Sequence, residues 1–238
     1  MIRATGSLLL LLVVSAAQAA SPTHVAGYDR PQAVLTAPDV GGGTARCSYY
    51  ADLTVRETGT DSPAPGAGSL RRGRGRGLRS CKAGGADVAL ETADFSYLGR
   101  KGIFLVFGLA DPHGAVPFLI IDAGKGNVIY KDSSDSGNFR SLAASGDTLR
   151  ADYRRAINAA CSILADTACW ASLAAKGLIT AEMAGMPPPV GACAAAYAAE
   201  KAPNDDPSVI IYNVELVLDR SGRAQSASSG RIGCRPLP

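Results

Sequence analysis

The apolar centre of the chain decides the fold class: residues 103–131 read IFLVFGLADPHGAVPFLIIDAGKGNVIYK. Three apolar runs lie within it, at Ile103–Leu109, Phe118–Ile121 and Val128–Lys131. Each is long enough for a strand, and turn residues (Pro and Gly in the first connection, two Gly in the second) separate them. Strands joined by such short connections predict an antiparallel meander.

Further strands are predicted towards the C-terminus. Residues 148–154 alternate apolar and polar side chains and predict a fourth strand. Residues 208–219 alternate over their whole length, with Ile210, Tyr212 and Val214 on one side, which predicts a long strand buried on one face. Residues 231–234 are expected to return as a short terminal strand.

One or two short helices are predicted between these strands. Asp166 or Thr167 can cap a helix through Leu173 and Ala174 that ends at Gly177. Residues 192–201 (ACAAAYAAEK) have high helix propensity. Strands therefore outnumber helices, and the helices cluster between strands. The predicted class is α+β, with an antiparallel sheet in a single domain over residues 46–238.

The N-terminus resembles an export signal in its order of charge and hydropathy. Arg3 precedes the apolar run Leu8–Val14, and Ala17-Gln18-Ala19 is a small-x-small cleavage pattern. We expect residues 1–19 to be removed and the protein to be periplasmic or secreted, with no transmembrane segment after cleavage. Residues 20–45, rich in Ala, Pro and Gly, are expected to form a flexible leader.

All six cysteines follow the predicted cleavage site, and an even count in an exported chain favours disulfides over metal ligands or a reactive thiol. Six cysteines allow fifteen pairings. Short loops favour Cys47–Cys81 and Cys169–Cys193, which leaves Cys161–Cys234. No Cys-x-x-Cys is present, so the sequence gives no support to a redox role or a cysteine zinc site.

An arginine-rich run is the most distinctive local feature of the sequence. The chain has 24 basic and 21 acidic residues, and this near-neutrality excludes a generally basic nucleic-acid binder. Without Arg3 the charge is +2, and without six clustered cations it would be about −4. Those six are the candidate anion-binding residues: Arg71, Arg72, Arg74, Arg76, Arg79 and Lys82. They lie in residues 57–85, which are expected to be a loop insertion rich in Gly, Pro and Arg.

Guanidinium forks bind phosphate and carboxylate groups bidentately, so this loop could hold an anionic envelope polymer or a lipid headgroup. Export and the lack of interleaved aromatic residues argue against nucleic acid as the partner. The plainer alternative is a solvated insertion without a ligand.

Evidence for catalysis in the sequence is sparse. His113, in a predicted turn, could act as a general base, but no Gly-x-Ser-x-Gly or Ser-x-x-Lys motif accompanies it. The oxygen-rich residues Asp132–Asp135 begin a segment with Gly137 where an EF-hand has its glycine. Ala143 stands where that loop needs a bidentate glutamate, so the motif is incomplete. We expect no metal site, no cofactor and no catalytic residue.

Four segments together resemble a group of secreted bacterial proteins of unknown function. They are Cys47-Ser48-Tyr49-Tyr50, the central hairpin from Ile121-Asp122 to Tyr130, Ala168-Cys169-Trp170, and Pro207–Glu215 followed by Gly230–Pro236. The likeness covers roughly residues 46–238. It implies export and paired cysteines but carries no assigned activity, and the arginine run is not part of the shared pattern.

The sequence therefore predicts an exported, disulfide-stabilised module that acts by binding or as a structural part of the envelope, with no enzymatic activity. One alternative is a small hydrolase or calcium-dependent enzyme that uses His113 and the Asp132–Asp135 loop. Another is a protein inhibitor of an enzyme.

Overall fold

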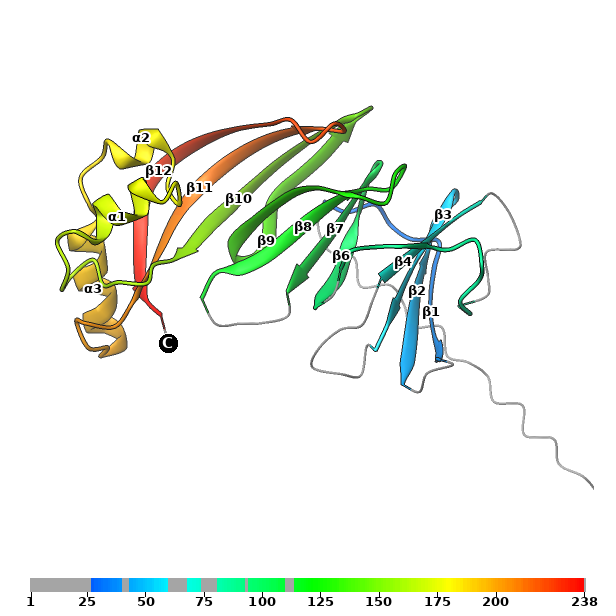
Figure 1. Ribbon diagram of the computed structural model, residues 1–238, viewed down its shortest axis with the longest axis horizontal. Coiled ribbons are helices and arrows are strands. Elements are labelled where there is room, and N and C mark those ends of the chain that lie inside the picture. Colours follow the sequence, from blue (N-terminus) through cyan, green and yellow to red (C-terminus); the bar gives the residue numbers. More distant parts are fainter. Residues whose placement is uncertain are drawn as a thin grey trace, which may run out of the picture.

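The computed structural model of the protein describes residues 27–39, 43–59, 68–73, 81–92, 94–109 and 114–237. The molecule is elongated, with a small sheet at one end, a large curved sheet in the middle and helices at the other end (Figure 1). The predicted signal residues 1–19, and His113, Arg74, Arg76 and Arg79 among the candidate site residues, lie outside the described ranges.

The small sheet has five antiparallel strands in the order of the chain. They are β1 (Ala33–Pro38), β2 (Thr44–Tyr49), β3 (Leu53–Thr58), β4 (Gly68–Arg72) and β5 (Val88–Ala89). Two of these strands correct the sequence-based prediction. β1 lies in residues 20–45, which were expected to be a flexible leader. Its backbone instead pairs with β2 from Ala33↔Tyr49 to Pro38↔Thr44. β4 lies in the expected 57–85 loop, where Leu70 is fully buried.

The large sheet has seven antiparallel strands in the spatial order β12-β11-β10-β9-β8-β7-β6. They are β6 (Phe95–Lys101), β7 (Phe104–Leu109), β8 (Val116–Asp122), β9 (Val128–Ser145), β10 (Thr148–Asn158), β11 (Ser208–Asp219) and β12 (Ala224–Pro236). The predicted meander is confirmed as β7, β8 and the start of β9, and β11 has the predicted bounds. The terminal strand is much longer than residues 231–234.

Strand β9 serves both halves of the large sheet. Its first part pairs with β8 as far as Val116↔Ser134, and from Ser134 onwards it pairs with β10. The sheet curves at this change of partner along β9 (Figure 1). The structure of β9 also corrects the expected Asp132–Asp135 loop, because both aspartates lie inside β9, where Asp132 pairs with Phe118 of β8 and the register to β10 shifts between Ser134 and Phe139.

The two largest apolar clusters of the described residues stabilise this arrangement. One lies between the sheets, where Leu53, Val55 and Leu70 of the small sheet pack with Leu105 and Phe107 of the large one. The other joins the large sheet to the segment between β10 and β11 and contains Phe118, Tyr153, Trp170, Leu173, Tyr197 and Tyr212. Burial of these large side chains is the main favourable term for the fold.

The segment between β10 and β11 contains three short helices: α1 (Cys169–Ala175), α2 (Ala181–Ala184) and α3 (Val190–Glu200). The fold is therefore mostly β, and the α+β class holds only in the broad sense that a separate helical segment packs on antiparallel sheets. The longest described helix, α3, has 11 residues, so none of the described helices could span a membrane.

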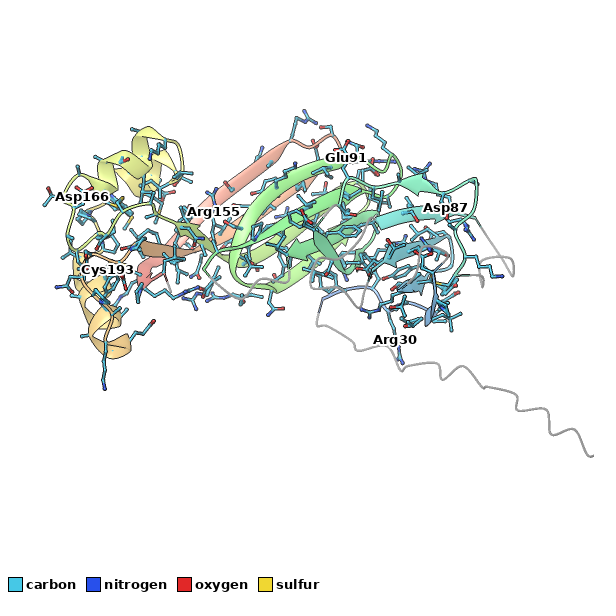
Figure 2. The ribbon with its side chains drawn as sticks, turned by 60° about the horizontal axis from the view of Figure 1, so that its bottom comes forward. Arg30, Asp87, Glu91, Arg155, Asp166 and Cys193 are labelled. Atoms are coloured by element: carbon cyan, nitrogen blue, oxygen red, sulfur yellow. A yellow bond between two sulfur atoms is a disulfide. The ribbon has the colours of Figure 1, made fainter. Side chains whose placement is uncertain are left out.

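Three disulfides crosslink the chain, and the described cysteines are all paired. Cys47 pairs with Cys81, as expected. The other two expected pairs are wrong: Cys161 pairs with Cys169, and Cys193 pairs with Cys234. The chain folds back between Cys161 and Cys169, whose Cα atoms are 5.8 Å apart. Cys193, labelled in Figure 2, lies on α3, which packs against β12, the strand that contains Cys234.

Candidate anion-binding surface

The turn between β8 and β9 is the centre of a basic surface. Asp122 organises it: its backbone carbonyl accepts hydrogen bonds from the N–H groups of Lys125 and Gly126, at 3.1 and 2.7 Å. Its Oδ1 accepts a further bond from the N–H of Gly124, at 2.7 Å. Gly126 has φ +81°, a conformation that glycine adopts without steric cost. The turn thus presents the exposed Lys125 side chain at its tip.

Arg220 joins this turn to two others. Its Nε donates to Oδ2 of the buried Asp122 at 2.9 Å, and its backbone N–H donates to the carbonyl of Asp147 at the same distance. A Cβ on Gly124 would lie 1.9 Å from the Arg220 guanidinium, so only glycine permits this approach. The turns β8–β9, β9–β10 and β11–β12 therefore meet at one end of the large sheet.

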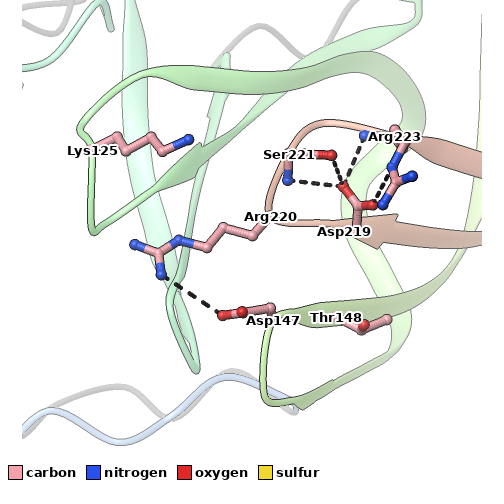
Figure 3. A pocket seen from close by; sticks show the side chains of 7 residues that line it. All are labelled: Lys125, Asp147, Thr148, Asp219, Arg220, Ser221 and Arg223. Atoms are coloured by element: carbon pink, nitrogen blue, oxygen red, sulfur yellow. Dashed lines mark hydrogen bonds and ion pairs between the residues drawn. The ribbon is translucent and has the colours of Figure 1, made fainter.

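A shallow hollow of about 340 Å³ opens between these turns (Figure 3). Its lining residues are Lys125, Asp147, Thr148, Asp219, Arg220, Ser221 and Arg223. Hydrogen bonds from the Ser221 hydroxyl and from the backbone N–H groups of Arg223 and Ser221 lower the pKa of Asp219 to about 2. Asp219 is therefore ionised at neutral pH and also binds the Arg223 guanidinium, at 2.7 Å.

A second, smaller hollow of about 160 Å³ lies on the other side of the β8–β9 turn. Arg72 and Arg100 line it, together with apolar groups that include Leu53 and Ile103. Arg100 is held by Asp52 through two hydrogen bonds of 2.5 and 2.9 Å, and its guanidinium lies 5.1 Å from the centre of the Tyr50 ring. The exposed Arg72 donates from Nε to the carbonyl of Ala123 at 3.2 Å.

Five cations thus surround one turn, and we call them the basic surface: Arg72, Arg100, Lys125, Arg220 and Arg223. Sequence reasoning found only Arg72 among them. Lys125 stands between two glycines, and Arg220 and Arg223 flank Ser221-Gly222, so basic residues in glycine turns were the available signal. The sequence could not show that these turns meet.

The predicted anion-binding residues have different surroundings in the structure. Arg71 is bonded to both carboxylate oxygens of Asp87, at 2.6 and 3.0 Å, and to the carbonyl of Lys82 at 2.7 Å. The hydrogen bond from Arg71 lowers the pKa of Asp87. Arg71 is therefore part of the scaffold that positions residues 81–87 beside β4, while Arg72 faces the hollow.

Asp132 and Asp135, the carboxylates that a hydrolase or calcium-dependent enzyme would use, are both bound by arginines. Asp132 accepts from the Tyr130 hydroxyl at 3.0 Å, from the Tyr153 hydroxyl and from Arg155 Nε at 2.7 Å (Arg155 is labelled in Figure 2). Burial, with a further contribution from the charge of Asp132, raises the pKa of Tyr130 to about 12. Asp132 and its partners therefore form a closed polar cluster on the sheet.

Asp135 lies between two other arginines, 3.2 Å from Arg154 Nη1 and 3.6 Å from Arg235 Nε. Within the described ranges no three His, Cys, Asp or Glu side chains are grouped so that they could hold a metal ion. The enzymatic and inhibitor alternatives stay predictions.

No family model matches the chain, and neither a curated protein nor a solved structure shows significant similarity to it.

Proposed function

We propose that this protein is an exported, non-enzymatic binding module whose basic surface holds an anionic partner, either an envelope polymer or the headgroups of a lipid surface. One observation carries the proposal: the Arg72 guanidinium bonds to Ala123, in the turn that also carries Lys125 and contacts Arg220. The arginine-rich segment therefore starts beside a second group of cations, and Arg74 follows Arg72 by two residues.

The charges of the basic surface support a polyanion better than a single small ion. Arg100, Arg220 and Arg223 each already bond to a carboxylate, whereas Arg72 and Lys125 form no ion pair with a described carboxylate. Two such cations without a described carboxylate partner bind a single small anion only weakly in water. A polymer or a charged membrane contacts these two together with Arg74, Arg76 and Arg79, and such contacts add up.

The proposed location rests on the signal-like N-terminus and on the three disulfides, which persist in oxidising compartments. Membership in the group of secreted bacterial proteins that the chain resembles is part of the same proposal.

The test compares two double charge reversals that give the same net charge. Arg72→Glu/Lys125→Glu changes the basic surface, and Arg150→Glu/Lys176→Glu changes two exposed cations elsewhere. Binding is measured to soluble polyphosphate and to phosphatidylglycerol vesicles, with phosphatidylcholine vesicles as the neutral control, at two salt concentrations. We expect the first variant to lose at least tenfold in affinity, the second to lose less than threefold, and binding to weaken as salt rises.

The two probes separate the two sources of anion. Binding to polyphosphate alone indicates a polymer partner, and binding to the vesicles alone indicates headgroups. If both double variants weaken binding equally, only net charge matters and the basic surface has no special role. If the wild type binds neither probe, the proposed function is wrong.

A further inference from the structure

Two sheets have four edge strands, and unpaired backbone groups on an edge are a template for another strand. The edges here are β1 and β5 of the small sheet and β6 and β12 of the large one. Natural sheets shorten, cover or interrupt such edges to prevent unwanted pairing. Three of the four edges in this protein are protected in one of these ways.

Strand β1 is short and is bounded by Pro31 and Pro38, which have no N–H to donate. Strand β5 has only two residues. Strand β6 is long but covered: Glu57 Oε1 accepts from the N–H of Tyr97 at 2.6 Å, and the carbonyl of Arg100 accepts from the N–H of Asp29 at 2.7 Å.

Among the described residues, none of these protections applies to the first half of strand β12. Residues 224–229 read AQSASS, without proline or charge, and all but the half-buried Ser228 are exposed. Figure 1 shows this part of β12 along the outer margin of the large sheet, away from α3, which packs on the disulfide-linked C-terminal half.

The register shows which backbone groups face outwards. Asp219 donates its N–H to the carbonyl of Arg223, so Asp219↔Arg223 is a hydrogen-bonded pair of the β11–β12 hairpin. Because such pairs alternate with non-hydrogen-bonded ones, the N–H and C=O groups of Ala224, Ser226 and Ser228 point away from β11. Within the described part of the chain, these outward groups form no other backbone bond.

We infer that residues 224–229 of β12 accept an extended peptide segment of a partner protein as an added strand of the large sheet. Six residues span about 20 Å and offer up to six main-chain hydrogen bonds, which is the usual basis of strand addition. Five of the six side chains at the edge are alanine or serine, and the sixth, Gln225, is exposed and unbranched, so neither face obstructs an incoming strand. This inference shares Arg223 with the basic surface but rests on the backbone of β12, and it does not require the proposed anion binding.

The charges at the two ends indicate the chemistry of the peptide. Arg223 precedes the open edge with its side chain 86% exposed, and the exposed Arg231 follows it. A segment with an acidic residue near each end therefore complements the edge. A second copy of this chain fits less well, because antiparallel pairing of two such edges would place Arg223 of one copy near Arg231 of the other, and like charges repel.

The probe is a synthetic nine-residue peptide of alternating threonine and valine with a glutamate at each end. It is N-methylated at alternate residues along one edge, so that it can add to a sheet but cannot stack on itself. Amide hydrogen exchange is followed at Ser226 and Ser228 of the oxidised protein. We expect at least tenfold slower exchange of these two amides when the peptide is bound.

Two substitutions at one position isolate the edge. Ser226→Pro removes an outward N–H and leaves the bonds to β11 intact, whereas Ser226→Ala keeps every backbone group. We expect the proline variant to bind the peptide at least tenfold more weakly and the alanine variant to bind it as the wild type does. Unchanged exchange of the other β11 and β12 amides in the Ser226→Pro variant would show that strand β12 is preserved. If the strand frays in that variant, Ser228→Pro is used in its place.

Three results would overturn the inference: no binding of the peptide to the wild type, equal binding to Ser226→Pro, or protection of amides outside residues 224–229 only. Sedimentation velocity is run in parallel. A dimer that Ser226→Pro abolishes would make a second copy the occupant and would replace the peptide proposal.

Discussion

The carboxylate of Asp122 is fully buried, and the only cation that bonds to it in the described structure is Arg220, 98 residues later, through a 2.9 Å hydrogen bond. This pair connects the β8–β9 turn to the β11–β12 turn and thereby assembles the larger hollow of the basic surface. A buried carboxylate without its cation is strongly unfavourable.

Replacement of Arg220 is therefore expected to destabilise the fold. Arg220→Gln should lower the Tm by several degrees. Asp122→Asn should lower the Tm much less in the Arg220→Gln variant than it does in the wild type. Arg223→Gln is the control, because that side chain is almost fully exposed. Thermal unfolding of the four variants checks this, and additive changes would mean that the pair is not coupled.

The second prediction concerns the disulfide connectivity. Proteolysis without reduction should release peptides linked through Cys161–Cys169 and Cys193–Cys234. On a loop-closure argument, replacing both cysteines of Cys193–Cys234, which closes 41 residues, should cost about 4 kcal/mol of unfolding free energy. Replacing Cys161 and Cys169, separated by 8 residues, should cost about 2.5 kcal/mol.

Urea unfolding of the two double variants measures these free energies. A linked peptide with Cys169 and Cys193 would contradict the connectivity, and a larger loss from the short loop would contradict the entropic reason.

The third prediction is a pH dependence from Glu57. Burial raises the pKa of this carboxyl above its ordinary value of 4.5, although the Tyr97 N–H partly opposes the shift. The folded state therefore binds the proton more tightly than the unfolded state does. Stability from this group is present at low pH and is lost as pH rises from about 4.5 through the raised pKa.

Glu57→Gln removes the ionisation and keeps an acceptor for Tyr97. The variant should be more stable than the wild type at neutral pH, and the difference should shrink as the pH falls towards 4. Urea unfolding across this range is the measurement. A difference that grows as the pH falls would have the wrong sign.

The fourth prediction compares two aspartates of β9. Asp132 is 5% exposed and bonds to two tyrosines and Arg155, so Asp132→Ala should cost roughly 3–5 kcal/mol, because it leaves buried polar partners unpaired. Asp135 is 16% exposed with longer ion pairs, so Asp135→Ala should cost about 1 kcal/mol. Denaturant unfolding of the two variants measures these free energies. Equal losses of unfolding free energy would show that the Asp132 cluster contributes no more stability than the ion pairs of Asp135.

The fifth prediction addresses calcium. The oxygens of Asp132 and Asp135 are engaged by arginine side chains, which a cation would have to displace. Millimolar Ca²⁺ should therefore leave the Tm of the chelator-treated protein unchanged, because a ligand that binds only the folded state would raise it. A rise in Tm that is lost in Asp132→Ala would favour the calcium-dependent enzyme.

The sequence predicted the strands whose burial follows a simple pattern and missed those whose position depends on neighbours. Residues 104–109 and 208–219 are apolar or strictly alternating, and both are strands. Residues 33–38 and 224–230 consist largely of small side chains, because β1 and β12 are edge strands that pack little. The second half of β9 buries only Leu142, so its composition is that of a loop.

The site could be predicted only in part, because its residues come from distant turns. Arg72 was visible in a basic run, but Lys125 and Arg220 are 95 residues apart and meet only through the curvature of the large sheet. The cysteine pairing failed for a related reason. Loop length alone favoured Cys169–Cys193, whereas packing of α3 on β12 brings Cys193 to Cys234.

The 41 residues between Cys193 and Cys234 set an order of events during synthesis. As the chain emerges from its N-terminus, Cys47 and Cys81 are the first pair available to oxidise, followed by Cys161 and Cys169. Cys193 must wait until Cys234 has emerged, 41 residues later. Until then its thiol is free to form the wrong bond with Cys161 or Cys169, so early closure of the eight-residue loop protects the growing chain from mispairing.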